Sequence, residues 1–545
     1  MNGRDIHLLQ KLNSAFAEEN WDELLNLLNP KIFRSFESKY DLKNSTIRNK
    51  TLLDSEYNRS LNFRELIAFP VLAKVAQILT TEDSVVPNDI KIGCLKCLGN
   101  SCFNSYVHQQ YISTTIERGT YSHDLYRVLA SNENLEEIEN SSSYPFDSHF
   151  PYEGVVGWTS NVITAFHCKF DSDLSDEKLE ILRLSIQFLC NLFTFACKDS
   201  NFPDQYNILQ FLYNTDLKDV IITMTHSKHI PIVRASCAFV HNALKEFEGK
   251  TFLEGEKKRL CSQLLKATKE GFESAKEALM LLLFEKDILR SVYCDMTIEN
   301  KLCLLEIIYN ELSNSMHKFG NEYKFTKDAI EFLIKRFCRK SDLILKTVDT
   351  CLDEIEPTEI VILLDILGAL TSRSCEECSF LKDQKSLLIN CSYLLKSIQT
   401  IGKLSDNYFT PLQKLSDVAS AIQGSTTKSD LQSHPTFGFK AGLIRIIGNM
   451  SYRNKEYQDL LREMDVVPLL LDCCNIDARN PLIMQWTILA LRNLCEDNPA
   501  NQEIIRNCNR VGVVESSVLQ EMGVALHEDE EGKKIGIVPL PRERK

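Results

Sequence analysis

Two stretches of the chain decide the fold: LIRIIGNMSYRNKEYQDLLRE at residues 443–463 and ILALRNLCEDNPANQEIIRN at residues 488–507. Aligned on one asparagine, they pair further asparagine and glutamine residues at a constant offset of 44 residues. The pairs are Asn449 with Asn493, Asn454 with Asn498, and Gln458 with Gln502. This offset lies within the roughly 40–47 residues of HEAT and armadillo units. The sequence therefore predicts stacked helical repeats.

Each stretch also carries an apolar stripe with helical spacing. The stripe residues are Leu443, Ile446, Ile447 and Met450 in the first stretch, and Met484, Ile488, Leu491 and Cys495 in the second. Gly and Pro together number only 35 of 545 residues, which disfavours a turn-rich all-β chain. We therefore expect an all-α fold, a right-handed α-solenoid of roughly ten armadillo/HEAT-like repeats.

The asparagine signature recurs upstream at Asn100, Asn191 and Asn242. Gaps of 91 and 51 residues then indicate about two repeats and one repeat. Between residues 243 and 423 the signature fades, although LLDILGALTS at residues 363–372 keeps a helical pattern. This indicates divergent repeats in the middle of the chain.

Composition shifts predict four regions. Residues 1–423 form divergent N-terminal repeats with an irregular loop near 131–151, and residues 424–434 form a linker loop. Residues 435–526 form the regular C-terminal repeats, and residues 527–545 form a flexible charged tail. At the last repeat, Asn501 is placed to cap a helix that follows the Asn498-Pro499 break.

Charge and cysteine usage narrow the class of protein. Lys and Arg number 62 against 75 Asp and Glu, a net charge of −13 that disfavours nucleic acid as a ligand. The sequence shows neither a secretory signal nor an apolar run long enough for a membrane span. The 19 cysteines lie mostly in apolar helical patterns, as reduced thiols in the cytoplasm do. We expect a cytoplasmic protein; its self-association stays open.

The segment from Phe439 and the Ile-Asp-x-x-Asn-Pro block at residues 476–481, followed by Trp486 and the helix at residues 491–494, resemble the ataxin-10 family. The resemblance covers residues 435–526 closely. It implies a solenoid adaptor without a catalytic centre, linked to cytokinesis, cell survival and signalling complexes. It also implies a cytoplasmic location, with centrosomal, midbody and ciliary-base settings.

The repeated asparagines are the candidate protein-binding residues, because a solenoid exposes a long concave surface. The candidates are Asn100, Asn191, Asn242, Arg445, Asn449, Leu489 and Asn493. Two interpretations stay open: the asparagines bond a partner's backbone, or they bond carbonyls of their own or the adjacent repeat.

The positions four residues before these asparagines bear on the partner. They are Lys96, Gln187, Ala238, Arg445 and Leu489. Importin-like receptors place Trp there to hold Lys side chains by cation–π contact, and none of these five residues is aromatic. We therefore expect neutral or acidic partner segments. An importin-like transport receptor stays an alternative.

Three groups of residues were weighed as metal ligands. They are Cys94, Cys97 and Cys102; Cys375 and Cys378; and His226, His229, Cys237 and His241. None has a second well-spaced CxxC partner, so we predict no metal and no cofactor, with copper or zinc handling as an alternative. No phosphate loop, nucleophile elbow or metalloprotease motif is present, so we expect no enzyme. Trp486 is expected to be buried between repeats.

Overall fold

The computed structural model describes most of the helical part of the chain. The described residues are 3–33, 69–81, 85–102, 152–167, 174–192, 217–246, 252–315, 326–347, 355–373, 380–381, 383–404, 406–412, 434–475, 477–508, 524–528 and 535–539. They fall into two compact units, Met1–Ile288 and Leu289–Lys545.

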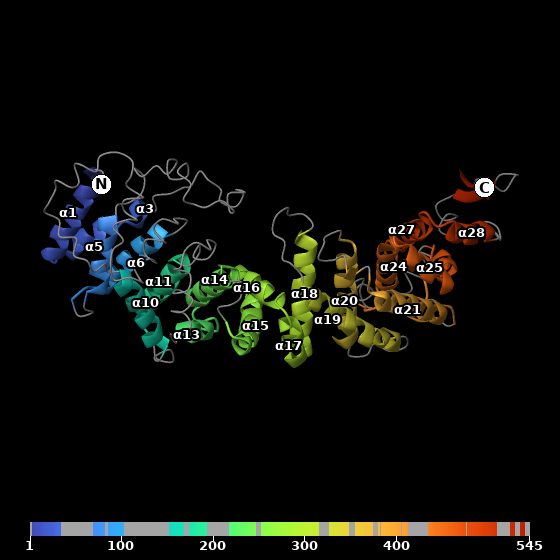
Figure 1. The fold of residues 1–545 in the computed structure, drawn as a ribbon, viewed down its shortest axis with the longest axis horizontal. Helices are drawn as coiled ribbons and strands as arrows, with labels where there is room; N and C mark the ends of the chain where they lie inside the picture. Colours follow the sequence, from blue (N-terminus) through green and yellow to red (C-terminus); the bar gives the residue numbers. More distant parts are fainter. Residues whose placement is uncertain are drawn as a thin grey trace, which may run out of the picture. The chain divides into compact units, whose positions relative to one another are not determined.

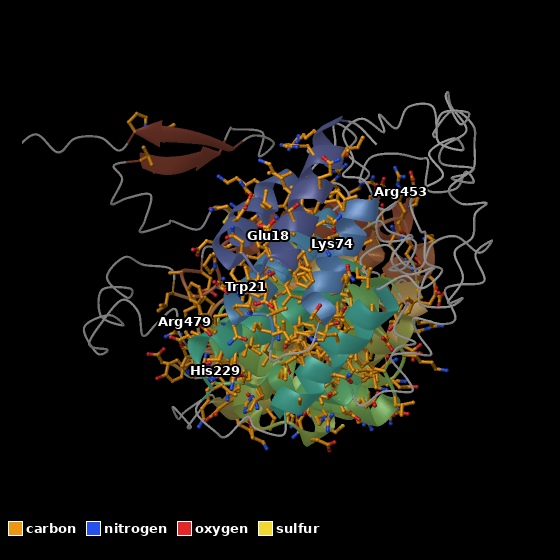
Figure 2. The ribbon with its side chains drawn as sticks, turned by 90° about the vertical axis from the view of Figure 1, so that its left-hand side faces the viewer. Glu18, Trp21, Lys74, His229, Arg453 and Arg479 are labelled. Atoms are coloured by element: carbon orange, nitrogen blue, oxygen red, sulfur yellow. The ribbon has the colours of Figure 1, made fainter. Side chains whose placement is uncertain are left out.

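The first unit consists of helices (Figure 1). They are α1 (Gly3–Ala17), α2 (Trp21–Leu27), α3 (Pro30–Phe33), α5 (Phe69–Thr80), α6 (Asn88–Cys102), α10 (Tyr152–His167), α11 (Asp176–Leu192), α13 (Leu217–Met224), α14 (Ile230–Glu246), α15 (Glu254–Lys269) and α16 (Glu273–Leu283). At its N-terminal end Phe16 packs edge-on against Trp21, and Lys74 lies 4.5 Å from the centre of the Phe16 ring (Figure 2).

The second unit adds further helices and ends in two short strands. They are α17 (Ile288–Asp295), α18 (Ile298–Ser315), α19 (Lys327–Lys340), the 3₁₀ helix η3 (Ser341–Thr347), α20 (Ile355–Thr371), α21 (Lys385–Leu404), α24 (Phe439–Ser451), α25 (Lys455–Glu463), α26 (Val466–Asp472), α27 (Ile483–Cys495), α28 (Pro499–Asn507), β1 (Val524–Glu528) and β2 (Ile535–Pro539).

One series of core helices runs through each unit. In the first unit α6 packs on α11, α11 on α14, and α14 on α16; in the second, α18 packs on α20, α20 on α24, and α24 on α27. Each core helix meets mainly its neighbours in the series and a helix of its own repeat, which is the packing of a solenoid. The predicted all-α class of helical repeats is confirmed. The handedness stays a prediction.

The 44-residue offset recurs in the helices themselves. It relates α24 to α27 and α25 to α28. Asn454 accepts a hydrogen bond from the backbone N–H of Tyr457 at 3.2 Å and caps α25. Asn498 caps α28 in the same way, accepting from the N–H of Asn501 at 3.3 Å. The expected cap at Asn501 is therefore wrong, because the capping oxygen belongs to the residue before Pro499.

Among the described residues, α27 is the last helix of the core series, and it differs from α24 at the position of closest approach. A Cβ atom on Gly448 would lie 3.0 Å from the Cα of Ala490, so α27 approaches α24 closely only because Gly448 has no side chain. The 44-residue offset places Arg492 at the same position of α27. Its side chain is exposed. A further helix cannot approach α27 as α27 approaches α24 without displacing this arginine.

Two sequence expectations differ from the structure. The 91-residue gap between Asn100 and Asn191 is a single step of the series, because α11 packs directly on α6. The segment expected to be a flexible tail, residues 527–545, contributes to the antiparallel hairpin of β1 and β2, in which Leu526 pairs with Ile537. The irregular loop expected at residues 131–151 lies outside the described residues. The division between the two compact units falls between Ile288 and Leu289 in the sequence. The linker expected at residues 424–434 stays a prediction, because residues 424–433 lie outside the described residues.

Candidate functional site

The repeated asparagines connect neighbouring core helices. In each of four repeats the side-chain amide donates a hydrogen bond to a backbone carbonyl of the preceding repeat or segment. Asn100 bonds Pro30 (3.0 Å), Asn191 bonds Gly99 (3.0 Å), Asn242 bonds Cys190 (3.4 Å) and Asn493 bonds Gly448 (2.9 Å). Because Gly99, Cys190 and Gly448 each precede an asparagine of the series, the bonds form a ladder. These hydrogen bonds are the ones expected if the asparagines bond carbonyls of the adjacent repeat.

Asn449 makes the same connection through a hydroxyl group. Its amide donates to Oγ1 of Thr371 at 3.2 Å, and Thr371 in turn donates to the carbonyl of Gly368 at 3.2 Å. No hydrogen bond between described residues uses Oδ1 of Asn449, and the side chain is half-buried. One acceptor of this asparagine therefore faces a partly open surface.

Arg445 lies one helical turn before Asn449, between two neighbouring helices. On one side a Cβ atom at Gly368 would lie 3.4 Å from Cδ and Nη1 of Arg445. On the other side the guanidinium carbon lies 5.2 Å from the centre of the Trp486 ring, a cation–π contact. Nη2 reaches the hydroxyl of Ser372 only at 3.5 Å. The glycine leaves room for the guanidinium, and the ring holds it in place.

The charge of Arg445 is only partly compensated. Burial lowers the pKa of Arg445, while Tyr309 and Asp365 act against this. Burial also raises the pKa of Asp365, and the charge of Arg445 opposes that rise. Among the described residues, Nε of Arg445 is buried without a hydrogen-bond partner. The guanidinium thus keeps hydrogen-bonding capacity, which a carbonyl or carboxylate can fill.

We define the α24–α27 strip as Arg445, Asn449, Trp486, Leu489 and Asn493. Arg445 and Asn449 lie on one face of α24, and the other three on one face of α27. Asn493 is buried, at 5% exposure, whereas the other four are half-buried. The expectation of a buried Trp486 is therefore wrong: its ring carries Arg445 at a partly open surface.

The Ile-Asp-x-x-Asn-Pro block holds the start of α24. Oδ1 of Asn480 accepts hydrogen bonds from the backbone N–H groups of Lys440 (3.0 Å) and Ala441 (3.4 Å), and its amide donates to Asp477 at 2.7 Å. The other carboxylate oxygen of Asp477 accepts from the N–H of Leu412 at 3.1 Å. The block therefore positions the strip rather than contacting a ligand. Its hydrogen-bond partners outside the block could not be read from the sequence, because they lie 39 or more residues away.

The sequence analysis missed Gly368, Thr371 and Ser372, which contact the strip from α20. A signal was available, because LLDILGALTS at residues 363–372 aligns with LIRIIGNMSY at residues 443–452 and places Gly368 on Gly448. The asparagine is replaced by alanine in this alignment, and this is why the signature appeared to fade.

The cysteine and histidine groups do not converge on a metal site within the described ranges. Cys94, Cys97 and Cys102 are buried, and burial raises their pKa values, that of Cys102 to about 12. Buried thiols of this kind stay protonated, whereas metal ligands are thiolates. Nε2 of His241 lies 3.6 Å from Glu277, and burial lowers the pKa of this histidine. Cys375 and Cys378 lie outside the described residues.

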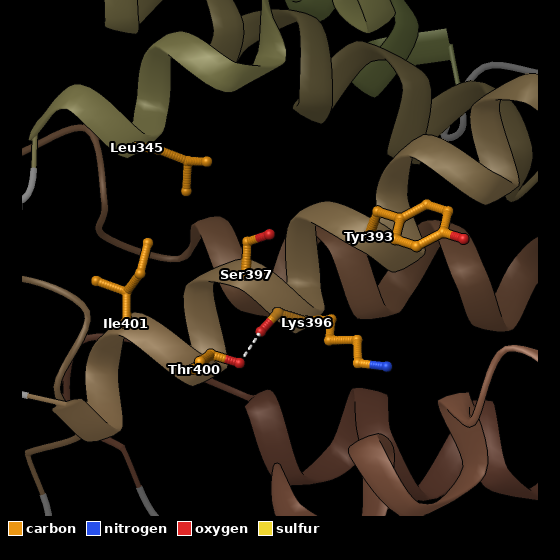
Figure 3. A pocket seen from close by; sticks show the side chains of 6 residues that line it. All are labelled: Leu345, Tyr393, Lys396, Ser397, Thr400 and Ile401. Atoms are coloured by element: carbon orange, nitrogen blue, oxygen red, sulfur yellow. Dashed lines mark hydrogen bonds between the residues drawn. The ribbon is translucent and has the colours of Figure 1, made fainter.

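A pocket of about 340 Å³ opens between η3 and α21 (Figure 3). Its lining residues are Leu345, Tyr393, Lys396, Ser397, Thr400 and Ile401. It lacks the paired acid and base that proton-transfer chemistry needs. Within the described ranges, none of the helices combines the length and apolar character that a membrane crossing requires.

Comparison with known proteins places the strip in a recognised segment. Residues 439–536 match the family model described as the spinocerebellar ataxia type 10 protein domain. Ataxin-10 of Xenopus tropicalis is 36% identical over 248 residues, which are 45% of this chain and 48% of that protein. This chain is thus similar to ataxin-10 over part of its length. Human ataxin-10 is 30% identical over 267 residues, 47% of this chain and 51% of its own length.

The similarity to these relatives covers only part of each protein. The chain spans about half the length of these curated ataxin-10 relatives. The ataxin-10 homolog of Dictyostelium discoideum is 42% identical over 95 residues, 17% of this chain and 16% of that protein. Among solved structures, SYS-1 aligns over 95% of this chain and 93% of its own at 11% identity, with a TM-score of 0.29. A TM-score this low supports no transfer of properties.

Proposed function

We propose that this ataxin-10 relative is a non-enzymatic scaffold in the cytoplasm that binds segments of other proteins along the α24–α27 strip. The observation that carries the proposal is Arg445, held between Gly368 and Trp486, whose guanidinium makes only a long hydrogen bond, to Ser372, among the described residues. Burying part of a guanidinium costs free energy, because the group loses hydration. A ligand that accepts hydrogen bonds from the guanidinium offsets that cost.

Asn449 and Leu489 complete the proposed contact. Asn449 uses its amide N–H toward Thr371, and its oxygen is placed to accept a hydrogen bond from a partner's backbone N–H. Leu489, half-buried on α27, offers an apolar contact beside it. Asn100, Asn191 and Asn242 hold repeats together through their amides and are proposed to contact a partner only at their exposed edges. The partner is expected to be neutral or acidic.

The alternatives receive less support. A basic nuclear signal needs a free aromatic ring for its lysines, but Arg445 already occupies a face of Trp486. A metal carrier needs exposed thiolates, but Cys94, Cys97 and Cys102 are buried, and burial raises the pKa values of these thiols. From the similarity to ataxin-10 we propose a role in cytokinesis, cell survival and signalling complexes.

Affinity purification of the tagged full chain from cells tests the scaffold proposal. Quantitative mass spectrometry would compare the wild type with Arg445→Glu, which reverses the charge of the strip. Arg506→Glu is the control, because Arg506 is 71% exposed on α28 and is paired with Glu503 outside the strip. We expect a set of proteins to be retained by the wild type and the control and lost from Arg445→Glu. Equal recovery by all three, at equal folded content, would contradict the proposal.

A further inference from the structure

The pocket between η3 and α21 is separate from the strip and is lined by side chains of two elements. Leu345 comes from η3, and the other lining residues come from α21 (Figure 3). Leu345 and Ile401 extend toward the same space, and Ser397 lies between them. The hydroxyl of Thr400 donates to the carbonyl of Lys396 at 2.8 Å, so it is used within the helix. The interior of the pocket is therefore mainly apolar.

The surface beside the pocket exposes large side chains that a globular protein usually covers. Tyr393 is 60% exposed, and Leu404, near the C-terminal end of α21, is 78% exposed. Tyr393, Lys396 and Thr400 follow one another at helical spacing and share one face of α21. A single exposed leucine is ordinary, but an exposed aromatic ring at the mouth of an apolar pocket is typical of a protein-binding site.

The rim of the pocket is basic. Lys396 lines it, and Lys346 follows Leu345 on η3; both are exposed. Among the described residues, no carboxylate lies within ion-pair distance of either lysine, whereas Lys403 on the next turns of α21 is paired with Asp472. The acidic residue of η3, Asp342, lies in its first turn and does not line the pocket. The chain as a whole has a net charge of −13, so two lysines without an ion-pair partner among the described residues make this surface locally more basic than the rest.

We propose that this pocket binds an acidic segment of a partner protein. The segment places one large apolar side chain between Leu345 and Ile401, and an Asp or Glu next to it pairs with Lys396. Tyr393, also in the pocket lining, offers the segment a further exposed aromatic contact on the same helix. Charge complementarity favours the acidic class of partner, because Lys396 and Lys346 have no ion-pair partner within the described ranges.

Selection from a phage-displayed library of random 12-residue peptides on the immobilised full chain tests the proposal. The fluorescein-labelled form of the most enriched peptide would then be titrated with the full chain by fluorescence anisotropy. We expect enriched sequences to carry an apolar residue beside Asp or Glu. Lys396→Glu should weaken binding at least tenfold, and Ser397→Phe, which fills the pocket, should do the same. Added NaCl should weaken wild-type binding.

Two controls keep the test decisive. Lys228→Glu makes the same charge change at an exposed lysine of the first unit and should bind like the wild type. The circular dichroism melt of each variant checks that it is folded. Enrichment without acidic residues, no enrichment at all, or equal affinity of a folded Lys396→Glu or Ser397→Phe would each overturn the proposal.

Discussion

A single asparagine side chain connects two repeats at each step of the ladder. The amide is suited to this because the carbonyls it reaches lie among the last four residues of their helices, where backbone C=O groups lack an intrahelical partner. The sequence alone showed that the asparagines recur, but it did not separate a ligand contact from an inter-repeat contact. The acceptors, such as Gly448 for Asn493, lie 45 or more residues away, and only packing brings them within 2.9–3.4 Å of the amides.

Replacing Asn493 tests how much the ladder stabilises the fold. Asn493→Ala removes the donor to Gly448 inside the protein, at a position only 5% exposed. We expect the free energy of unfolding to fall by about 1–3 kcal/mol. Asn449→Ala should cost less, because Asn449 is half-buried and reaches only a hydroxyl. Urea unfolding of the full chain measures both; a larger loss for Asn449→Ala would contradict this account.

His434 gives the second unit a dependence on pH. Its ring stacks on Tyr408 with centroids 4.0 Å apart, and burial, with the charge of Arg479, lowers its pKa to about 4. Unfolded histidine takes up a proton near pH 6.5, so the unfolded chain binds more protons between these values. Stability is therefore fully present above about pH 6.5 and falls as the pH drops toward 4.

Urea unfolding at pH 7 and pH 5 measures this loss. His434→Gln should reduce the difference in stability between the two pH values, without abolishing it, because burial lowers the pKa of His241 as well. His7→Gln serves as the control, since His7 is exposed on α1, and it should leave the difference as in the wild type. A difference unchanged in His434→Gln would count against the assignment.

At the scale of elements, α24 depends on a segment that follows it in the chain. Residues 477–480 cap its first turn, so the helix is completed only when the next repeat has folded onto it. The sequence predicted α24 and α27 well, because their stripes and their offset are local patterns. It could not predict this cap, or the hairpin of β1 and β2, because both depend on contacts or pairings that periodicity does not encode.

Asn480→Ala tests the cap. It leaves the N–H groups of Lys440 and Ala441 without their acceptor in a buried setting. We expect a loss of about 1–2 kcal/mol in the free energy of unfolding, in the range of a lost N-cap. Asn475→Ala is the matched control: its amide makes only an exposed hydrogen bond to the carbonyl of Asp472, and the change should be nearly neutral. Equal losses in the two variants would show that the cap is unimportant.

For the whole molecule, the series of core helices predicts that damage stays local. Gly448→Val forces a side chain against Ala490, where even a Cβ atom would be at 3.0 Å, and we expect a loss of about 1–3 kcal/mol. Hydrogen exchange should show lost protection in α24, α27 and α28 and unchanged protection in α6, α11 and α14, because each repeat contacts only its neighbours.

Gly157→Ala is the counterpart in the first unit. No atom lies within 4 Å of a Cβ placed at Gly157, which is inside α10. We expect this change to raise stability by about 0.5–1 kcal/mol through helix propensity. If Gly448→Val instead lowered protection in α6 as much as in α27, the molecule would unfold as one cooperative body.

Arg492 bears on how additional repeats could be designed into this protein. Packing another unit on the far face of α27 calls for Arg492→Gly first. The glycine at the equivalent position of α24 is what lets α27 approach closely. Duplicated units inserted between residues 451 and 483 would instead meet the glycine-bearing surface that already accepts a neighbour.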